Sequence, residues 1–198
     1  MTTSCARSFV AQLPKDYHVD AITNHQAPTA IQGPEDGDAA VPGLLNIISN
    51  GNFDAYVIAC FDDTGLAEAR TITQKPVIGI GQASFHLAAL LSRRFSVLTT
   101  LAVSIPVIAE NIDAQGFTLI CDGVYASGVP VLELETAPDE SCKVISSHLQ
   151  NMAVKNPGNA VVLGCAGMTN IWNKLQPDHK ITLIDPVAAA AKLIPVIA

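Results

Sequence analysis

The sequence of 198 residues carries little charge: Asp, Glu, Lys and Arg together account for 15% of it. Its 11 basic residues stand against 18 acidic ones, which gives a formal net charge of −7. The basic residues are scattered, and only Arg93 and Arg94 are adjacent, so no basic stripe is available to neutralise phosphate groups. We therefore do not expect nucleic acid to be a partner.

Long apolar runs are also lacking. The C-terminal stretch "DPVAAAAKLIPVIA" is among the most apolar, but charge and proline interrupt it before it reaches the length of a membrane span. We expect a soluble protein without a membrane partner. With 49% hydrophobic residues and few charges, the chain has apolar surface to spare, and we expect a homo-oligomer.

Paired cysteine motifs are missing too. The five cysteines are odd in number and form no CxxC pair, and "MTTSCARSFVAQL" shows no signal-peptide pattern. This usage indicates reduced thiols in a cytoplasmic protein and not a disulfide scaffold. The five histidines form no HxH or HExxH cluster, so we expect no metal site.

What the sequence does contain is an alternation of short apolar runs and amphipathic stretches, which is typical of parallel sheets flanked by helices. The expected strands are His18–Thr23, Ala55–Ala59, Val77–Ile80, Phe95–Thr99, Phe117–Cys121, Ala160–Gly164 and Ile181–Ile184. The expected helices are Thr3–Leu13, Gly37–Ser49, Ala83–Ser92, Ser104–Ala114, Pro138–Val154 and Val187–Leu193.

The two halves of this layout repeat each other. Cys60 follows one apolar run and lies 17 positions before Val77, and Cys165 follows another and lies 16 positions before Ile181 (77 − 60 and 181 − 165). We therefore predict an α/β fold of two similar lobes, related by a pseudo-twofold, with the active site between them. Residues 1–94 and 181–198 form the first predicted lobe and residues 95–180 the second.

The repeat is uneven at its start. The second half opens with the strand Phe95–Thr99 before its helix, whereas the first half opens directly with a helix. We therefore expect the first lobe to lack an N-terminal strand that the second lobe has.

The two matched cysteines carry the candidate chemistry. A thiol at the carboxyl end of a parallel strand lies where open α/β sheets bind ligands, and backbone N–H groups with a helix dipole can lower its pKa. Asp62 and Asp63 would raise the pKa of Cys60 if they pointed at its sulfur. The other cysteines, Cys5, Cys121 and Cys142, are interpreted as small buried hydrophobes.

Two thiols that face each other across a cleft suit the inversion of a carbon with an acidic proton. One thiolate removes the proton from one face while the opposing thiol delivers a proton to the other face. A decarboxylase or an isomerase on the same scaffold remains an alternative, although a decarboxylase needs no second thiol. A non-catalytic binding protein with a degenerate site is a further alternative.

Several stretches also carry a family resemblance: "VIACFDDTGLAEAR", "KPVIGIGQASFHLA", "FSVLTT", "VVLGCAGMT" and "DPVAAAAKL". Together they resemble the aspartate/glutamate racemase superfamily, most closely its hydantoin and allantoin racemase branch. The resemblance implies an isomerase without cofactor or metal, with Cys60 and Cys165 as the catalytic acid/base pair. The implied substrate-binding set is Phe61, Thr99, Thr100, Gly164, Ala166 and Gly167. Backbone N–H groups come from Phe61, Ala166 and Gly167 and hydroxyls from the two threonines. The branch usually begins with a strand and an Asn-Pro-Asn-Thr-like turn, which this sequence lacks.

The substrate class follows in part from charge. No positively charged pair lies in the cysteine motifs, so free carboxylates would have to be held by backbone amides and hydroxyls alone. A neutral cyclic ureide, a hydantoin or allantoin, suits such a pocket better, and its C5 proton is more acidic than that of a free amino acid. An Asp/Glu-type amino-acid racemase remains the alternative.

Overall fold

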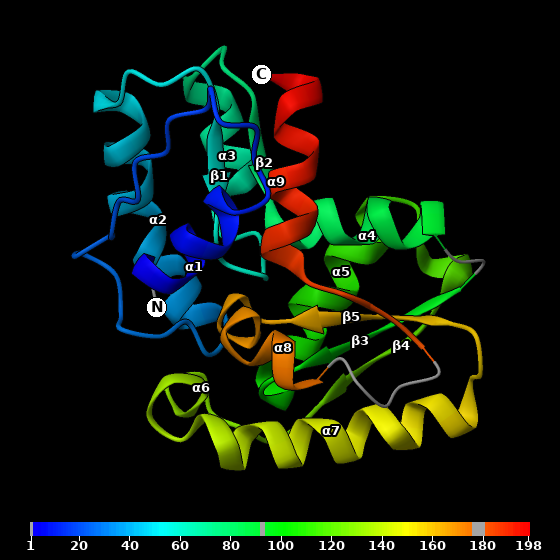
Figure 1. Ribbon diagram of the computed structural model, residues 1–198. Helices are drawn as coiled ribbons and strands as arrows, with labels where there is room; N and C mark the ends of the chain where they lie inside the picture. The colour runs from blue at the N-terminus through cyan, green and yellow to red at the C-terminus, as the bar shows by residue number, and fades with distance from the viewer. Residues whose placement is uncertain (1, 92–93, 176–180) are drawn as a thin grey trace.

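The computed structural model describes residues 2–91, 94–175 and 181–198, which form two parallel sheets with helices packed around them (Figure 1). The smaller sheet pairs β1 (Tyr56–Ile58) with β2 (Val77–Gly79). The larger sheet has the order β4-β3-β5-β6, with bounds Cys121–Ala126, Phe95–Thr99, Ala160–Gly164 and Thr182–Ile184. Two separate parallel sheets confirm the predicted α/β fold with two lobes.

Helices connect these strands and cover both faces of the larger sheet. Their bounds are α1 (Thr2–Val10), α2 (Pro34–Asn50), α3 (Leu66–Ile72), α4 (Ile80–Leu91), α5 (Ile105–Ala114), α6 (Glu133–Thr136), α7 (Pro138–Lys155), α8 (Trp172–Leu175) and α9 (Pro186–Ile197). Short 3₁₀ helices span Ala102–Ser104, Thr118–Ile120 and Ala166–Ile171, here η1, η2 and η3. Figure 1 shows α4 and α5 on one side of the larger sheet and α7 on the other.

Local sequence explains where the main helices begin. The longest, α7, starts with Pro138, whose missing N–H costs nothing at that position, and carries two acidic residues in its first turn and Lys155 in its last. The Asp185 side chain caps α9 by accepting the backbone N–H groups of Val187 and Ala188. This cap places the start of α9 directly after β6.

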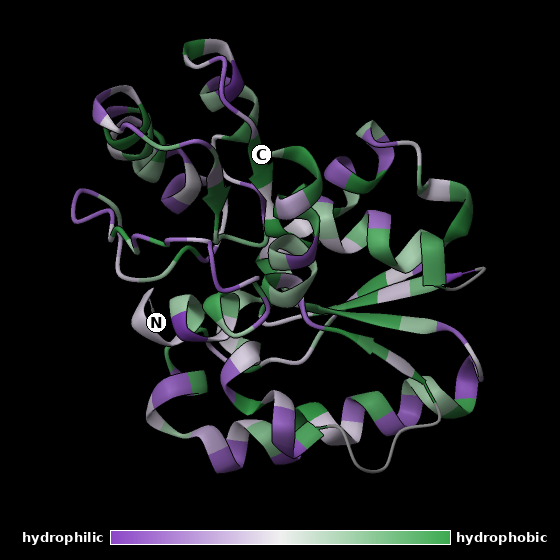
Figure 2. Ribbon diagram, turned by 45° about the horizontal axis from the view of Figure 1, so that its top comes forward, coloured by the Kyte–Doolittle hydropathy of each residue, from purple (hydrophilic) through white to green (hydrophobic). Residues whose placement is uncertain are grey.

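One hydrophobic core runs from the smaller sheet into the larger one. It joins Ile78 of β2 and Phe61 to α4, α9 and the inner strands β3 and β5. Every residue of β3 and of β5 is buried. The rings of Phe61 and Phe85 meet edge to face at 5.7 Å, and Phe85 stacks on Phe95 at 6.0 Å between centroids. Strands buried on both faces read as continuous apolar runs, and Figure 2 shows β3 and β5 in hydrophobic colours. The two lobes therefore share a core.

Two predicted strands differ from the structure, and helices occur that were not expected, among them α3, α6 and α8. The predicted strand His18–Thr23 is wrong: this segment is irregular, all but Val19 of it is exposed, and His18 pairs with Asp20 at 3.0 Å. The strand expected at Phe117–Cys121 begins only at Cys121, because Thr118–Ile120 forms η2.

The chain crosses between the lobes near two segments that the structure does not describe. Residues 92, 93 and 176–180, at which we expected the chain to leave and re-enter the first lobe, lie outside the described residues. Beyond the second gap, β6 pairs with β5 in the larger sheet, whereas α9 packs against α1 and α4. The segment from 181 that we assigned to the first lobe thus contributes its strand to the sheet of the second.

Candidate active site

Cys60 lies in the turn that follows β1. The turn is closed by the backbone N–H of Asp63, which donates to the Cys60 carbonyl at 3.1 Å. The Cys60 Sγ lies 3.3 Å from Oγ1 of Thr64. The chain then enters α3, so the thiol sits between the end of a strand and the start of a helix, as expected for a ligand-binding position in an α/β protein.

Asp63 anchors this turn to α4. Its φ of 50° is in the left-handed region, which Asp tolerates better than most residues. Its Oδ1 accepts the N–H of Gly81 at 2.9 Å, and its Oδ2 accepts the N–H of Gln82 at 2.7 Å. The carboxylate needs the space above Gly79, because a Cβ there would lie 1.9 Å from Oδ1. Burial raises the pKa of Asp63 to about 7, although the two N–H donors lower it.

Cys165 occupies the matching position at the end of β5, immediately before η3. Its carbonyl accepts the N–H of Met168 at 3.1 Å, and the residue is 8% exposed. The preceding residue must be small, because a Cβ on Gly164 would lie 2.8 Å from the Cα of Thr99 on the neighbouring strand. The close β3–β5 pairing therefore fixes where the thiol emerges from the sheet.

Burial and nearby charges raise the pKa of both thiols. Burial raises the pKa of Cys60 to about 11, and the charge of Asp62 adds to this rise. Burial raises the pKa of Cys165 to about 12, with the Gly167 N–H acting against it and the charge of Cys60 adding to it. The effect of the Cys60 charge on Cys165 indicates that the two residues lie within electrostatic range of each other. We expected backbone donors and helix dipoles to lower the pKa of both thiols. Both pKa values are raised instead, because burial outweighs the donors.

Asp62 is a third acidic group beside the thiols. Its carboxylate accepts the hydroxyl of Ser104 at 3.2 Å, while its backbone carbonyl accepts Nδ2 of Asn111 at 2.9 Å. Burial raises the pKa of Asp62 to about 6, against the effect of Ser104. Its charge raises the pKa of both thiols. We expected Asp62 and Asp63 to raise the pKa of Cys60 if they pointed at its sulfur. Asp62 has this effect, whereas the carboxylate of Asp63 points to α4.

The structure gives each of the other expected substrate-binding residues a definite place. Phe61 is 4% exposed and packs its ring into the shared core. The hydroxyl of Thr99 donates to the Gly164 carbonyl at 3.0 Å, so it braces the Cys165 strand. Thr100 is 4% exposed, and its carbonyl accepts the Gly128 N–H at 2.8 Å. Ala166 and Gly167 open η3 next to the Cys165 sulfur.

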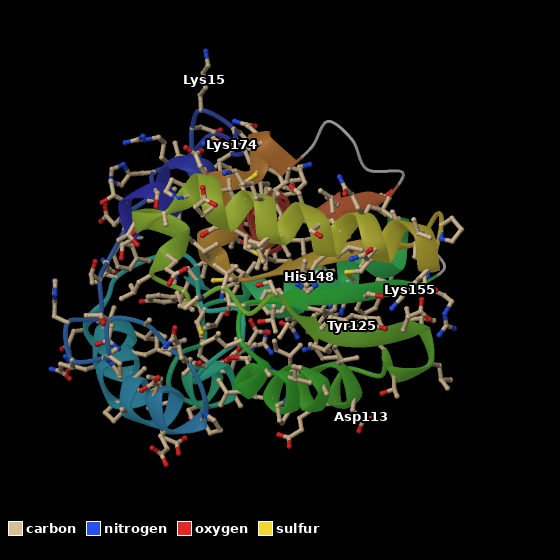
Figure 3. The ribbon with its side chains drawn as sticks, turned by 90° about the horizontal axis from the view of Figure 1, so that it is seen from below. Lys15, Asp113, Tyr125, His148, Lys155 and Lys174 are labelled. Carbon is tan, nitrogen blue, oxygen red and sulfur yellow. The ribbon has the colours of Figure 1, made fainter. Side chains whose placement is uncertain are left out.

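A pocket of about 390 Å³ adjoins the turn that carries Cys60. It is lined by Asp62, Asp63 and Thr64 together with residues of α2, α3, α4 and α5, and neither Cys60 nor Cys165 lines it. In the part of the chain that the structure describes, no three His, Cys, Asp or Glu side chains are placed to hold a metal ion. Other charged side chains lie on the surface of the protein, as Figure 3 shows for Lys15 and Asp113, which point away from the molecule.

The sequence analysis missed the contact of Thr64 and the role of Asp63 in this site. It treated Asp62 and Asp63 as disturbances of Cys60 and did not consider Thr64. The run "CFDDTG" itself could have signalled them, because Asp, Thr and Gly after a strand are typical of a turn with side-chain caps.

Comparison with known proteins agrees with this geometry. The family model for Asp/Glu/Hydantoin racemase matches residues 1–194. A hydantoin racemase from Rhizobium meliloti is 39% identical over 196 residues, which cover 98% of this chain and 81% of the relative. The structure of allantoin racemase from Klebsiella pneumoniae superposes with a TM-score of 0.91 at 32% identity, covering 98% of this chain and 81% of that one.

More distant structures share the fold alone. A glutamate racemase from Bacillus anthracis has a TM-score of 0.70 at 18% identity and covers 99% of this chain and 77% of its own. The match of the family model over nearly the whole chain and the 39% identity to a racemase decide the assignment. The chain belongs to the Asp/Glu/hydantoin racemase family.

Proposed function

We propose that this protein is a racemase that inverts C5 of a hydantoin-type cyclic ureide, with Cys60 and Cys165 as acid and base. The observation that carries the proposal is the pair of thiols at the ends of β1 and β5. The charge of Asp62 raises the pKa of both thiols, and the charge of Cys60 raises the pKa of Cys165. The hydantoin racemase at 39% identity and the allantoin racemase structure at 32% identity support the substrate class.

The reaction balances without any further reagent. The thiolate of one cysteine takes the proton from C5, and the electron pair of that C–H bond moves into the adjacent carbonyl to give an enolate. The thiol of the other cysteine then gives its proton to the opposite face of C5. The inverted product leaves an enzyme in which thiol and thiolate have exchanged, which is the form that catalyses the reverse direction.

The raised pKa values of both thiols fit this scheme. Because the charge of Cys60 raises the pKa of Cys165, Cys165 loses its proton less readily once Cys60 is ionised, and the pair favours one thiol beside one thiolate. A buried thiolate with a high pKa is also a strong base, which suits a weakly acidic carbon. The cost is a small ionised fraction at neutral pH.

The backbone after each cysteine supplies the groups that stabilise the enolate. In our proposal, the N–H groups of Phe61, Ala166 and Gly167 donate to the substrate carbonyls, and Thr100 lies at the same edge of the larger sheet. Fixed donors aimed at developing negative charge are among the largest contributions to catalysis. Thr99 acts indirectly, because its hydroxyl holds the Gly164 carbonyl.

Charge at the site favours a neutral ring over an amino acid. A substrate carboxylate would face the field of Asp62, and Arg70 is engaged with the carbonyl of Val77 and the side chain of Gln82. The glutamate racemases resemble this chain in fold alone. We therefore rank an Asp/Glu-type racemase second.

The test is optical. Enantiopure 5-methylhydantoin, allantoin and L-glutamate are each incubated with the protein, and rotation is followed by polarimetry beside the variant Cys60→Ser/Cys165→Ser. We expect rotation to decay to zero with a ureide and the wild-type protein only. Decay with glutamate alone would replace the proposal by its alternative, and constant rotation with all three would overturn both.

The setting of the protein is also part of the proposal. No helix in the described part of the chain is long and apolar enough to cross a bilayer. The five cysteines are free, which agrees with a reducing, cytoplasmic compartment. Exposed leucines at the end of α4 and in η2, Leu90 at 79% and Leu119 at 86%, favour a homo-oligomer.

A further inference from the structure

Cys5 makes a specific contact with the turn that carries Cys165. The residue lies on α1, is 6% exposed, and its Sγ donates to the carbonyl oxygen of Ala166 at 3.6 Å. Ala166 directly follows Cys165 and is the first residue of η3. A thiol 161 positions away in the sequence thus touches the backbone next to the second proposed catalytic cysteine.

The contacted carbonyl belongs to a peptide group that also reaches the Cys165 sulfur. The carbonyl of Ala166 and the N–H of Gly167 are the two ends of one planar unit and point in opposite directions. One end accepts from the thiol of Cys5, and the N–H at the other end interacts with the Cys165 sulfur, which lowers the pKa of that thiol. A donor on the carbonyl polarises the peptide and strengthens its N–H as a donor.

We propose that Cys5 is a positioning residue for the racemase reaction: its thiol fixes and polarises the Ala166–Gly167 peptide, whose N–H stabilises the thiolate of Cys165. The inference rests on the proposed function for its catalytic meaning, but the contact can be tested on the thiol alone. Cys5 is a small buried residue of the hydrophobic core, as expected, and the proposal adds a second role for its thiol.

Two further observations support this role. Burial raises the pKa of Cys5 to about 11, so its thiol keeps its proton at neutral pH and acts as a donor. The peptide it holds opens a 3₁₀ helix, whose internal hydrogen bonds have poorer geometry than those of an α-helix. A side chain from α1 therefore adds orientation where the local backbone supplies little.

The test compares Cys5→Ala, which removes the donor, with Cys5→Ser, which keeps one in a similar volume. Without substrate, the alkylation of Cys165 by iodoacetamide is followed at fixed pH by mass spectrometry of the peptides, with Cys60 in the same sample as reference. We expect alkylation of Cys165 to slow about threefold in Cys5→Ala, because the thiolate fraction falls as the pKa rises. We expect Cys5→Ser to restore it and Cys60 to be unaffected in both.

The same variants are then assayed for racemisation across pH. The alkaline rise of kcat/KM should move to higher pH by about half a unit in Cys5→Ala and return in Cys5→Ser. A Cys5 thiolate would raise the pKa of Cys165 by its charge, but the pKa of Cys5 is about 11, so Cys5 acts as a neutral donor below that pH. The other charged and titratable groups stay in place: Asp62 and Cys60 near Cys165, and Asp185 and Glu135 near Cys5.

The matched control is Cys142→Ala, which makes the same change on α7, where the thiol lies 3.9 Å from Ser146. It should leave both readouts unchanged, and melting temperatures show whether each variant is folded. Equal alkylation of Cys165 in wild type and Cys5→Ala would overturn the proposal. Equal slowing in Cys5→Ala and Cys5→Ser would also overturn it, because packing alone would then explain the effect. Alkylation does not require turnover, so failure of the proposed function would be seen separately.

Discussion

The thiol of Cys60 and the hydroxyl of Thr64 lie 3.3 Å apart, Sγ to Oγ1. When Cys60 is ionised, the hydroxyl can donate to the thiolate, and this contact lowers the pKa of Cys60 against the larger effect of burial. Asp62 acts in the opposite sense from the same turn, because its negative charge raises that pKa. Two neighbours thus tune one thiol in opposite directions.

Replacing Thr64 by valine should weaken the enzyme through Cys60. Thr64→Val keeps the shape but removes the donor, so the pKa of Cys60 rises and kcat/KM at pH 7 falls by roughly three- to tenfold. The pH profile should move to the alkaline side. Thr64→Ser, which keeps the hydroxyl, is the control, and an unchanged profile in Thr64→Val would contradict the role of this contact.

Replacing Asp62 by asparagine should have the opposite effect. Asp62→Asn removes a negative charge near both thiols but keeps an oxygen that can accept the Ser104 hydroxyl. Both thiols then ionise at lower pH, and the alkaline rise of kcat/KM should shift down by about half to one pH unit. The measurement is the pH dependence of initial racemisation rates. A shift to higher pH would show that Asp62 acts other than by its charge.

Each catalytic thiol should be essential for inversion but not for both half-reactions. Cys60→Ser and Cys165→Ser should each lower racemisation by about 10²–10⁴-fold, because a serine hydroxyl is a much weaker acid than a thiol and is scarcely ionised near neutral pH. In deuterium oxide, each variant should still exchange the C5 proton of the one enantiomer that its remaining cysteine can reach. Proton NMR of each separate enantiomer follows this exchange. Full racemisation in either variant would rule out the two-base mechanism.

The space above Gly79 should be needed for stability. A Cβ at this position would lie 1.9 Å from Oδ1 of Asp63, so Gly79→Ala should displace that carboxylate from α4 and cost about 2 kcal/mol or more of unfolding free energy. Gly37→Ala in α2 is the matched control. Its Cβ would meet nothing closer than 3.8 Å, and an alanine in a helix should be neutral or stabilising by up to about 1 kcal/mol. Thermal denaturation that ranks the two variants the other way would contradict this reading of the site.

The stability of the protein should decline as pH rises from about 4 to 7. Burial raises the pKa of Asp63 from 3.8 to about 7, so the folded state holds this proton over a range in which the unfolded chain has lost it. The stabilisation is complete below the unfolded pKa and is lost as pH passes the folded one, and it amounts to roughly 4 kcal/mol at most. Asp62 and Asp185, whose pKa values burial also raises, act in the same direction. Urea unfolding of wild type and Asp63→Asn at several pH values tests this, since the variant should show a smaller decline.

The sequence predicted the features that depend on local pattern. The strands Phe95–Thr99 and Ala160–Gly164 were predicted to the residue, because both are short, mainly apolar segments between polar stretches. The resemblance to the racemase superfamily is confirmed by the family match over residues 1–194. The roles of Cys60 and Cys165 stay a prediction.

What the sequence could not predict depends on contacts between distant segments. Val19 and Ile22 suggested a strand, but a strand needs a neighbour, and this segment finds none among the described residues. The capping of α4 by Asp63 depends on a left-handed turn and on a contact 18 positions away. The contact of Cys5 with Ala166 spans almost the entire chain and leaves no periodic signature in the sequence.

The ring contacts from Phe61 through Phe85 to Phe95 limit how this enzyme can move. A two-lobed enzyme that swings open about a hinge would have to pull these buried rings apart or shift them together, and either would disturb the close packing of the interior. We therefore expect the frame that carries the two thiols to move little, and the substrate to enter between the surface loops around the site. Enlarging the range of ring substituents by engineering should accordingly succeed in those loops and fail at the rings, where every added volume would shift one thiol relative to the other.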